Sequence, residues 1–426
     1  MKSLLRAAFT VALLCSAAGT LVLTAPAAVA ADEQKLSAKV AKPLSDAIKA
    51  AQAKDYPTAL ADVKLAQAVE GRTPFEDYKI NAILTFIAIN MKDYDTATTA
   101  IEAAADSPVM PDADKPTTLR NALLLSAQAK QYQKAIAYGQ QLQALGPLDP
   151  TLEGTLAQVY YYLQDFVHAQ QYAQMTIDAD KAAGKTPDEA VLQIVMIAQA
   201  KQNNMGGAQE TLENLAVNFN KPESWSQLID IALSRKGVKD PDALYLLRLK
   251  FIIPGAMRDD DYASLANVAN LQGYPTEALN ALQKGIQLGK ITTAQAGSTF
   301  SQARNGAAMD QRSLGQYAAQ AERAKSGQQD IKLAEDYWGY GRYADASAAA
   351  ARAVAKGGMT DPSEGPMLIG MLDVVQGKYD AGVQSLSQVT GSPTRMASAH
   401  LWTLYAQAQL KASQPPAPPP ATPPAQ

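Results

Sequence analysis

The chain has 426 residues, of which 47% are hydrophobic and 19% are charged, and its formal net charge is −3. Its lysines and arginines form no basic stripe, so the electrostatic footprint of a nucleic-acid-binding protein is missing and we expect no nucleic-acid partner. Length alone allows two or three domains, but the internal repeats described below favour one elongated solenoid.

Residues 1–30 have the pattern of a secretory signal peptide. Lys2 and Arg6 form a short positive region, and a nearly uncharged apolar stretch over 7–23 follows it. The small residues of Ala28-Val29-Ala30 then predict a cut after Ala30. An uncleaved membrane anchor is the alternative interpretation of this segment.

Cleavage would remove the single cysteine, Cys15, and would leave a mature chain without disulfides or thiol chemistry. No later segment is apolar over the length that a membrane span requires. We therefore predict a bacterial periplasmic protein with no integral membrane span.

A short cassette recurs from residue 54 onward. It consists of Gly or a polar residue, then Tyr or Phe, and a small residue five residues after the first position. The aromatic residue stands two residues after the first position, except in the copy 273–278, where Tyr274 directly follows Gly273. Copies lie at 54–59, 92–97, 130–135, 164–169, 273–278, 341–346 and 377–382. The small residues of the first four copies are 38, 38 and 34 residues apart. A period in the mid-thirties is typical of a solenoid of helix-turn-helix repeats.

Counting from the cassettes, we expect a solenoid over 31–411 with about ten helical hairpins and one terminal helix. The hairpins are predicted near 40–70, 78–106, 116–145, 151–183, 188–219, 224–253, 259–288, 294–325, 328–357 and 363–391, and the last helix near 396–411. Two of them, 224–253 and 294–325, rest on the interval alone. Residues 292–330 contain few large apolar side chains, so we expect that stretch to be loosely packed or irregular. The segment 412–426, with seven prolines in its last thirteen residues, predicts a disordered proline-rich tail.

The spacing within the best copy can be compared with a known repeat. Its pattern is Leu333-Ala334, Tyr337, Gly341, Tyr343, Ala346 and Ala353, and Leu156-Ala157, Tyr160, Phe166 and Ala169 repeat it. These offsets resemble the tetratricopeptide repeat (TPR) over nearly the whole mature chain, although Gly382 replaces Ala in the last copy. The stretch from Asn220 to Pro275 is also similar to exported bacterial TPR proteins.

The resemblance implies an all-α, right-handed superhelix whose concave face is lined by the first helix of each hairpin. It places Phe86, Ile89, Gln158, Tyr161, Asn267, Asn270 and Trp338 on that face. We expect Trp338, Tyr161 and Asn270 to be the main partner-binding anchors, with Phe86 and Gln158 beside them. The alternative for Trp338 and Tyr161 is burial against a neighbouring hairpin. Trp225 and Trp402 are expected to be core or capping residues.

We find no pattern that indicates catalysis, a metal site or a cofactor. The mature chain has two histidines: we expect His168 to be solvated and His400 to pack, and neither has a second ligand at metal spacing. The glycines of 285–290 do not complete a phosphate-binding loop. The sequence therefore predicts a non-catalytic adaptor that captures a peptide or helix in its concave groove, in envelope assembly or transport. The alternative is a solenoid that binds glycan or cell wall.

Overall fold

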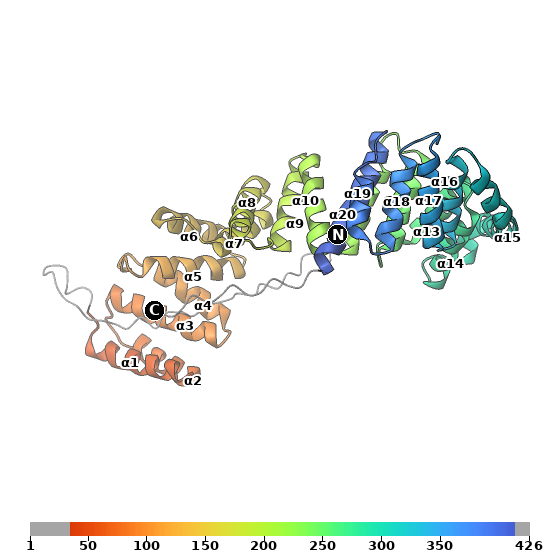
Figure 1. The fold of residues 1–426 in the computed structure, drawn as a ribbon. Coiled ribbons are helices and arrows are strands. Elements are labelled where there is room, and N and C mark those ends of the chain that lie inside the picture. The colour runs from red at the N-terminus through yellow and green to blue at the C-terminus, as the bar shows by residue number, and fades with distance from the viewer. Residues whose placement is uncertain (1–34, 414–426) are drawn as a thin grey trace. The chain divides into compact units, whose positions relative to one another are not determined.

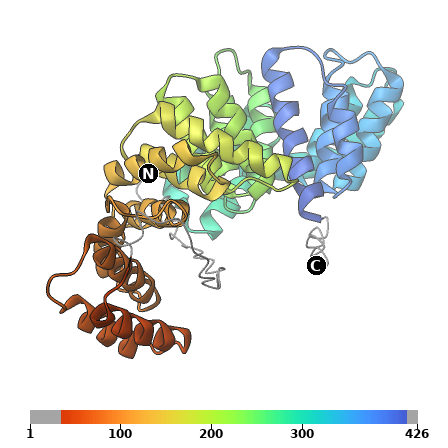
Figure 2. The same ribbon diagram turned by 90° about the vertical axis from the view of Figure 1, so that its left-hand side faces the viewer.

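The computed structural model describes residues 35–413, and all elements in that range are α-helices. The predicted signal peptide and the proline-rich stretch 414–426 lie outside the described residues. The chain divides into two compact units, 1–208 and 209–426, with the boundary inside α10. Figures 1 and 2 show the helices along the chain, and each unit is described by itself.

Unit 1 consists of consecutive antiparallel helices. They are α1 (Ala38–Gln52), α2 (Tyr56–Gln67), α3 (Pro74–Asn90), α4 (Tyr94–Ala105), α5 (Lys115–Gln128), α6 (Tyr132–Leu145), α7 (Pro150–Tyr162), α8 (Phe166–Ala182) and α9 (Glu189–Lys201). α10 (Met205–Phe219) follows.

Unit 2 contains ten further helices. They are α11 (Pro222–Leu233), α12 (Asp240–Ile252), α13 (Asp259–Leu271), α14 (Pro275–Gln287), α15 (Thr293–Arg323), α16 (Gln328–Gly339), α17 (Tyr343–Lys356), α18 (Glu364–Val375), α19 (Tyr379–Leu386) and α20 (Pro393–Ser413). Apart from 294–325, the predicted hairpins and terminal helix begin and end within five residues of the observed helices.

Each part of the cassette has a structural role, which the first copy illustrates. Lys54, two residues after the end of α1, is left-handed with φ of 61°, and the amide of Asp55 donates to the carbonyl oxygen of Ala50. The Asp55 carboxylate then caps α2 by accepting from the Thr58 amide at 3.2 Å. Tyr56 begins α2. Lys92, Lys130, Gln164 and Asn203 are left-handed at the equivalent turns.

The small residue that closes each cassette packs where the two helices of a hairpin meet. Ala59, Ala97, Ala135, Ala169, Ala278 and Ala346 are fully buried, and Ala208 is nearly so. Because alanine has no side chain beyond Cβ, these residues let the two helices of a hairpin approach closely.

Gly341 illustrates the backbone requirement of these turns. Its φ is 68°, and an added Cβ would meet no atom within 4 Å, so Gly341→Ala changes the backbone energy alone. We expect Gly341→Ala to lower the free energy of unfolding by about 1 kcal/mol. The control, Gly315→Ala, lies inside α15 with equally open space, and we expect it to raise stability by about 0.5–1 kcal/mol. Urea unfolding followed by tryptophan fluorescence measures both, and shifts of the same sign would contradict this account.

The segment 292–330 differs from the predicted hairpin. The span α15 covers 31 residues and is interrupted by a kink at Gly297, whose φ of 53° is non-helical, so that one long helix follows a short first turn. Its composition explains the difference. Alanine, glutamine and arginine favour helix, but few large apolar residues are available to hold a second helix against it, and its buried residues are mainly alanines.

The C-terminal helix of unit 2 returns to the beginning of that unit. α20 packs against α18 and α19, and also against α11 and α12. In Figures 1 and 2, α20 (dark blue) lies beside the green helices that begin unit 2. Arg395 of α20 donates to buried Asp242 of α12 at 2.5 Å, and the indole of Trp402 donates to the carbonyl oxygen of Tyr245 at 2.9 Å. Unit 2 is thus closed by its own last helix.

Candidate functional site

Unit 1 presents a row of residues at one repeated position of its first helices. We take the left-handed residue of each turn as position 0. Position −6 is then occupied by Ile48 in α1, Phe86 in α3, Leu124 in α5, Gln158 in α7 and Ile197 in α9. We call these five residues the first-helix stripe. Ile48 and Phe86 are 37% and 41% exposed, and the other three are half-buried.

Equal position in equivalent helices puts the stripe residues on one face of unit 1. First helices of neighbouring hairpins pack side by side in the pairs α1–α3, α5–α7 and α7–α9. Packed helix axes lie roughly 8–10 Å apart, so the stripe residues of each packed pair are spaced at about that distance. Four of the five are large and apolar, and the stripe can therefore accept a row of apolar side chains from a partner.

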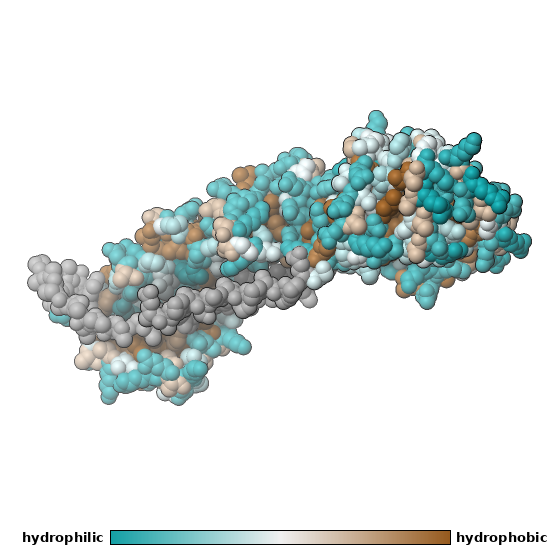
Figure 3. Space-filling view, viewed as in Figure 1, coloured by the Kyte–Doolittle hydropathy of each residue, from teal (hydrophilic) through white to brown (hydrophobic). Residues whose placement is uncertain are grey.

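An aromatic cluster lies next to Gln158, at the turn between α7 and α8. The rings of Tyr132 and Tyr162 are stacked with centroids 5.4 Å apart, and Tyr161 meets the ring of Phe166 edge-on at 6.3 Å. Tyr162 is 43% exposed. On the face drawn in Figure 3, apolar groups lie over α6 and α8 and are separated by hydrophilic ones. The tyrosine rings of this cluster combine a large apolar surface with a terminal hydroxyl group, a combination that is common in residues that anchor protein interfaces.

The five residues predicted as anchors fall in different surroundings. Phe86, Gln158 and Tyr161 all belong to unit 1 and are at least partly accessible. Asn270 of α13 is half-buried, and its side-chain nitrogen donates to no atom of the described residues. Trp338 of α16 is only 6% exposed, so the expectation that it is an accessible anchor is corrected.

Trp338 is buried because unit 2 covers this face with its own helices. Trp338 occupies position −3, equivalent to Tyr161 in unit 1, counted from Gly341. Its indole meets the ring of Trp402 of α20 at 6.2 Å, and the guanidinium of Arg248 of α12 lies 5.0 Å from its ring centre. At position −6 of α16, Glu335 is buried as well. Tyr337 is half-buried beneath the guanidinium of Arg342. Trp225 and Trp402 are fully buried, as predicted.

A buried ionic cluster joins three helices of unit 2 beside Trp338. Arg248 donates to both carboxylate oxygens of Glu277 (α14), at 2.7 and 2.6 Å, and to Glu335 (α16). The hydroxyl of Tyr245 also donates to Glu335, at 3.2 Å. Burial lowers the pKa of Arg248, but the two glutamates outweigh it and raise that pKa overall. Burial raises the pKa of Glu335. The cluster holds α12, α14 and α16 together.

Asp336, next to this cluster, gives unit 2 a pH-dependent stability. Burial and the negative charges of Asp310 and Glu335 raise the pKa of Asp336 to about 7. A raised pKa means that folding opposes the charged form, so stability falls as pH rises from about 4 to 7. We expect Asp336→Asn to raise the free energy of unfolding by about 2 kcal/mol at pH 8, after allowance for partial exposure, and by less at pH 5.

The measurement for this substitution is urea unfolding at both pH values. The exposed carboxylate of Asp345, which pairs with Arg342, supplies the control Asp345→Asn, for which we expect no gain at pH 8. An equal effect of Asp336→Asn at pH 5 and pH 8 would show that burial and charge do not set its pKa.

The histidines and acidic residues do not assemble a metal centre. Within residues 35–413, no group of three or more His, Cys, Asp or Glu side chains could hold a metal ion. His168 is exposed, as predicted, and its ring contacts Asp165 at 2.7 Å. His400 was expected to pack, but it is exposed, and its Nε2 lies 2.9 Å from a carboxylate oxygen of Glu213. None of the described helices is long and apolar enough to cross a membrane.

Sequence reasoning missed the apolar members of the stripe and the ionic cluster. Ile48, Leu124 and Ile197 could have been found by counting six residues back from each turn residue. Arg248 and Glu335 are 87 residues apart in the chain, and no local pattern brings them together.

The chain was compared with protein families, curated proteins and solved structures. No protein-family model and no curated protein matches the chain. A solved tetratricopeptide repeat protein from Parabacteroides merdae is 13% identical, with a TM-score of 0.34 over 63% of this chain and all of that one. Naa15/Naa10 bound to HypK-THB is 12% identical, with a TM-score of 0.33 over 83% of this chain and 64% of that one. The P58(IPK) TPR domain is 11% identical, with a TM-score of 0.23 over 88% and 99%. The turns and helix pairs described above are themselves TPR-like, and the fold is an all-α TPR-like solenoid.

Proposed function

We propose that the protein is a non-catalytic interaction scaffold that binds a partner protein through the first-helix stripe of unit 1. The observation that carries the proposal is the stripe itself: four large apolar side chains at one repeated position, all at least partly accessible to solvent. In unit 2, α12 and α20 cover Glu335 and Trp338 of α16, whereas the stripe of unit 1 retains exposed apolar surface. In unit 2 the element that covers this face, α20, is a helix. We therefore favour an amphipathic helix as the partner element for the stripe of unit 1, and an extended peptide is the alternative.

The energetics suit a reversible contact. Complete burial of one large apolar side chain contributes about 1.5–3 kcal/mol, and these side chains are already partly buried. Four such residues with the aromatic cluster must offset an association cost of at least about 4 kcal/mol. We expect dissociation constants of about 1 μM, with most of the affinity supplied by a few residues.

The proposed setting is the periplasm, in envelope assembly or transport. The support for this setting is the leader pattern of Lys2, Arg6 and Ala28-Val29-Ala30, together with a mature chain free of cysteine. Mass spectrometry of the N-terminus of the mature protein tests the export proposal directly. A mature N-terminus at Ala31 is expected, and an intact N-terminus at Met1 would contradict cleavage.

Site-specific crosslinking in cells tests the stripe. A photoreactive amino acid replaces Phe86 in one variant and exposed Lys181 of α8 in a control variant. We expect one discrete protein to be captured from position 86 and not from position 181. Equal capture at both positions would overturn the stripe as the binding surface. Capture of no protein, with retention on isolated cell wall, would favour the glycan-binding alternative.

A double substitution measures how much the stripe contributes to the affinity for the partner. We expect Phe86→Ser with Leu124→Ser to weaken binding of the captured partner about 100-fold, because each loss removes about 1–2 kcal/mol of apolar contact. Leu65→Ser is the matched control, since Leu65 is 62% exposed but lies on α2, a second helix. Isothermal titration calorimetry measures affinity, and circular dichroism confirms that the variants fold. Equal weakening by Leu65→Ser would contradict the assignment.

A further inference from the structure

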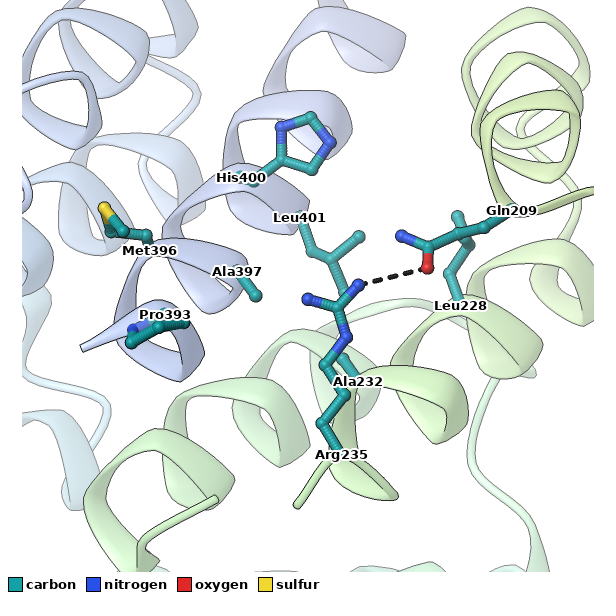
Figure 4. A pocket seen from close by; sticks show the side chains of 9 residues that line it. All are labelled: Gln209, Leu228, Ala232, Arg235, Pro393, Met396, Ala397, His400 and Leu401. Atoms are coloured by element: carbon teal, nitrogen blue, oxygen red, sulfur yellow. Dashed lines mark hydrogen bonds between the residues drawn. The ribbon is translucent and has the colours of Figure 1, made fainter. Parts of the chain in front are cut away.

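A pocket of about 220 Å³ lies where α20 returns to the beginning of unit 2. Its apolar side is formed by Leu228 and Ala232 of α11 and Leu401 of α20, all buried. Its polar side is formed by Gln209 of α10, by Arg235 just after α11 and by His400 of α20. Figure 4 shows the side chain of Arg235 extending past Ala232 toward Gln209. This pocket is separate from the first-helix stripe, and the inference goes beyond the proposed function.

The polar side of the pocket is a chain of hydrogen bonds that leaves most donors of Arg235 free. Arg235 Nη2 donates to Gln209 Oε1 at 3.0 Å, and Gln209 Nε2 donates to Glu213 Oε1 at 2.9 Å. The other oxygen of Glu213 is 2.9 Å from Nε2 of His400. The two carboxylate oxygens of Glu213 are therefore engaged, one by Gln209 and the other by His400. Among the described residues, Arg235 has an amide as its hydrogen-bond partner and no carboxylate at ion-pair distance.

We infer that this pocket binds a carboxylate attached to a compact apolar group, with Arg235 holding the carboxylate and the apolar side holding the side chain. A guanidinium has five N–H donors in a planar fork that matches a carboxylate with two parallel hydrogen bonds. The volume corresponds to about seven water molecules, enough for a side chain of the size of leucine. Such a group occurs in small free carboxylates and at the C-terminal residue of a protein chain, and the experiment below separates these two sources.

The electrostatics of the pocket depend on His400. The hydrogen bond to Glu213 raises the pKa of His400 above its usual value, and the same contact helps to keep the pKa of Glu213 low although burial acts against this. The charged groups that face His400 are Glu213 and Arg235. Protonated His400 neutralises Glu213, which would otherwise repel an incoming carboxylate. Affinity for the carboxylate should therefore increase as pH falls through the pKa of His400.

Calorimetric titration of the intact protein with N-acetyl-leucine tests the inference, and N-acetyl-leucinamide serves as the uncharged match. We expect N-acetyl-leucine to bind with a dissociation constant of about 1 mM, and the amide at least tenfold more weakly. Arg235→Gln should reduce carboxylate binding about tenfold, and Ala397→Leu, which fills the pocket, should abolish it. Arg342→Gln, at an exposed site elsewhere in unit 2, should leave it unchanged. Tryptophan fluorescence on heating confirms that each variant folds.

The two sources are separated by peptides that end in leucine, with a free or an amidated C-terminus. Binding of the free-carboxylate peptide at least tenfold more tightly than N-acetyl-leucine would assign the pocket to a chain end. Equal affinity would assign it to a small free carboxylate. Equal binding of N-acetyl-leucine and its amide, or unchanged carboxylate binding by Arg235→Gln, would overturn the inference. Absence of carboxylate binding to the folded native protein would also overturn it.

Discussion

Replacement of Arg248 by methionine is expected to lower the free energy of unfolding of unit 2 by about 3–5 kcal/mol at pH 7. The substitution keeps most of the side-chain volume but leaves the carboxylates of Glu277 and Glu335 without their cation. Both carboxylates have side chains less than a tenth exposed, so water cannot replace the lost contact. Removing one partner of a buried ion pair costs more than the pair itself contributes, because the remaining charge stays desolvated.

Two further variants distinguish this explanation from a simple packing defect. Arg248→Met combined with Glu277→Gln and Glu335→Gln removes all three charges, and we expect it to recover most of the lost stability. Arg342→Met breaks an exposed ion pair with Asp345, and we expect it to change stability by less than about 0.5 kcal/mol. The readout is urea unfolding followed by tryptophan fluorescence. All three tryptophans, Trp225, Trp338 and Trp402, lie in unit 2, so the signal reports that unit alone. A triple variant as unstable as Arg248→Met would contradict the charge argument.

Replacement of Trp402 by alanine is expected to destabilise unit 2 by about 3–5 kcal/mol and to release α20. The side chain is fully buried, its indole nitrogen donates to Tyr245, and its ring packs against Trp338. Alanine removes the largest side chain that α20 places against α12 and α16, and it leaves a cavity that the surrounding helices can only partly fill.

Hydrogen exchange measures the release of α20 separately from global unfolding. We expect the amides of α20 to exchange about 100-fold faster in Trp402→Ala, since about 3 kcal/mol corresponds to that factor. Gln407→Ala, at an exposed position of the same helix, is expected to leave exchange unchanged. Equal exchange rates for α20 in Trp402→Ala and the native protein would show that this side chain does not hold the helix.

The local part of the fold could be predicted because the cassette combines several local signals. In the turn that begins with Lys54, one residue ends the first helix, Asp55 caps the second, Tyr56 begins it and Ala59 lets the two helices meet. These contacts span a few residues, so the hairpin bounds follow from the sequence. In α15 the signals were absent, and the interval alone suggested a hairpin where the chain forms one long helix after a kink at Gly297.

The surroundings of Trp338 could not be predicted for the opposite reason. Its position in the repeat is equivalent to that of Tyr161, and the local pattern of the two sites is similar. What separates them is the return of α20, which brings Trp402 onto the face of α16 from more than sixty positions further along the chain. Periodicity predicts which residues share a face but not whether another helix later covers it. Phe86 is exposed and Tyr161 is half-buried, whereas Trp338 is buried.

The return of α20 also determines when each unit can fold. In unit 1, contacts join neighbouring hairpins, such as the hydrogen bond from Ser37 to Glu76 across 39 residues, and chains with such short-range contacts fold rapidly. The bond from Arg395 to Asp242 spans 153 residues. A chain that emerges from its N-terminus presents α12 well before α20. Unit 2 therefore completes its folding only after α20 has emerged, whereas unit 1 can fold hairpin by hairpin.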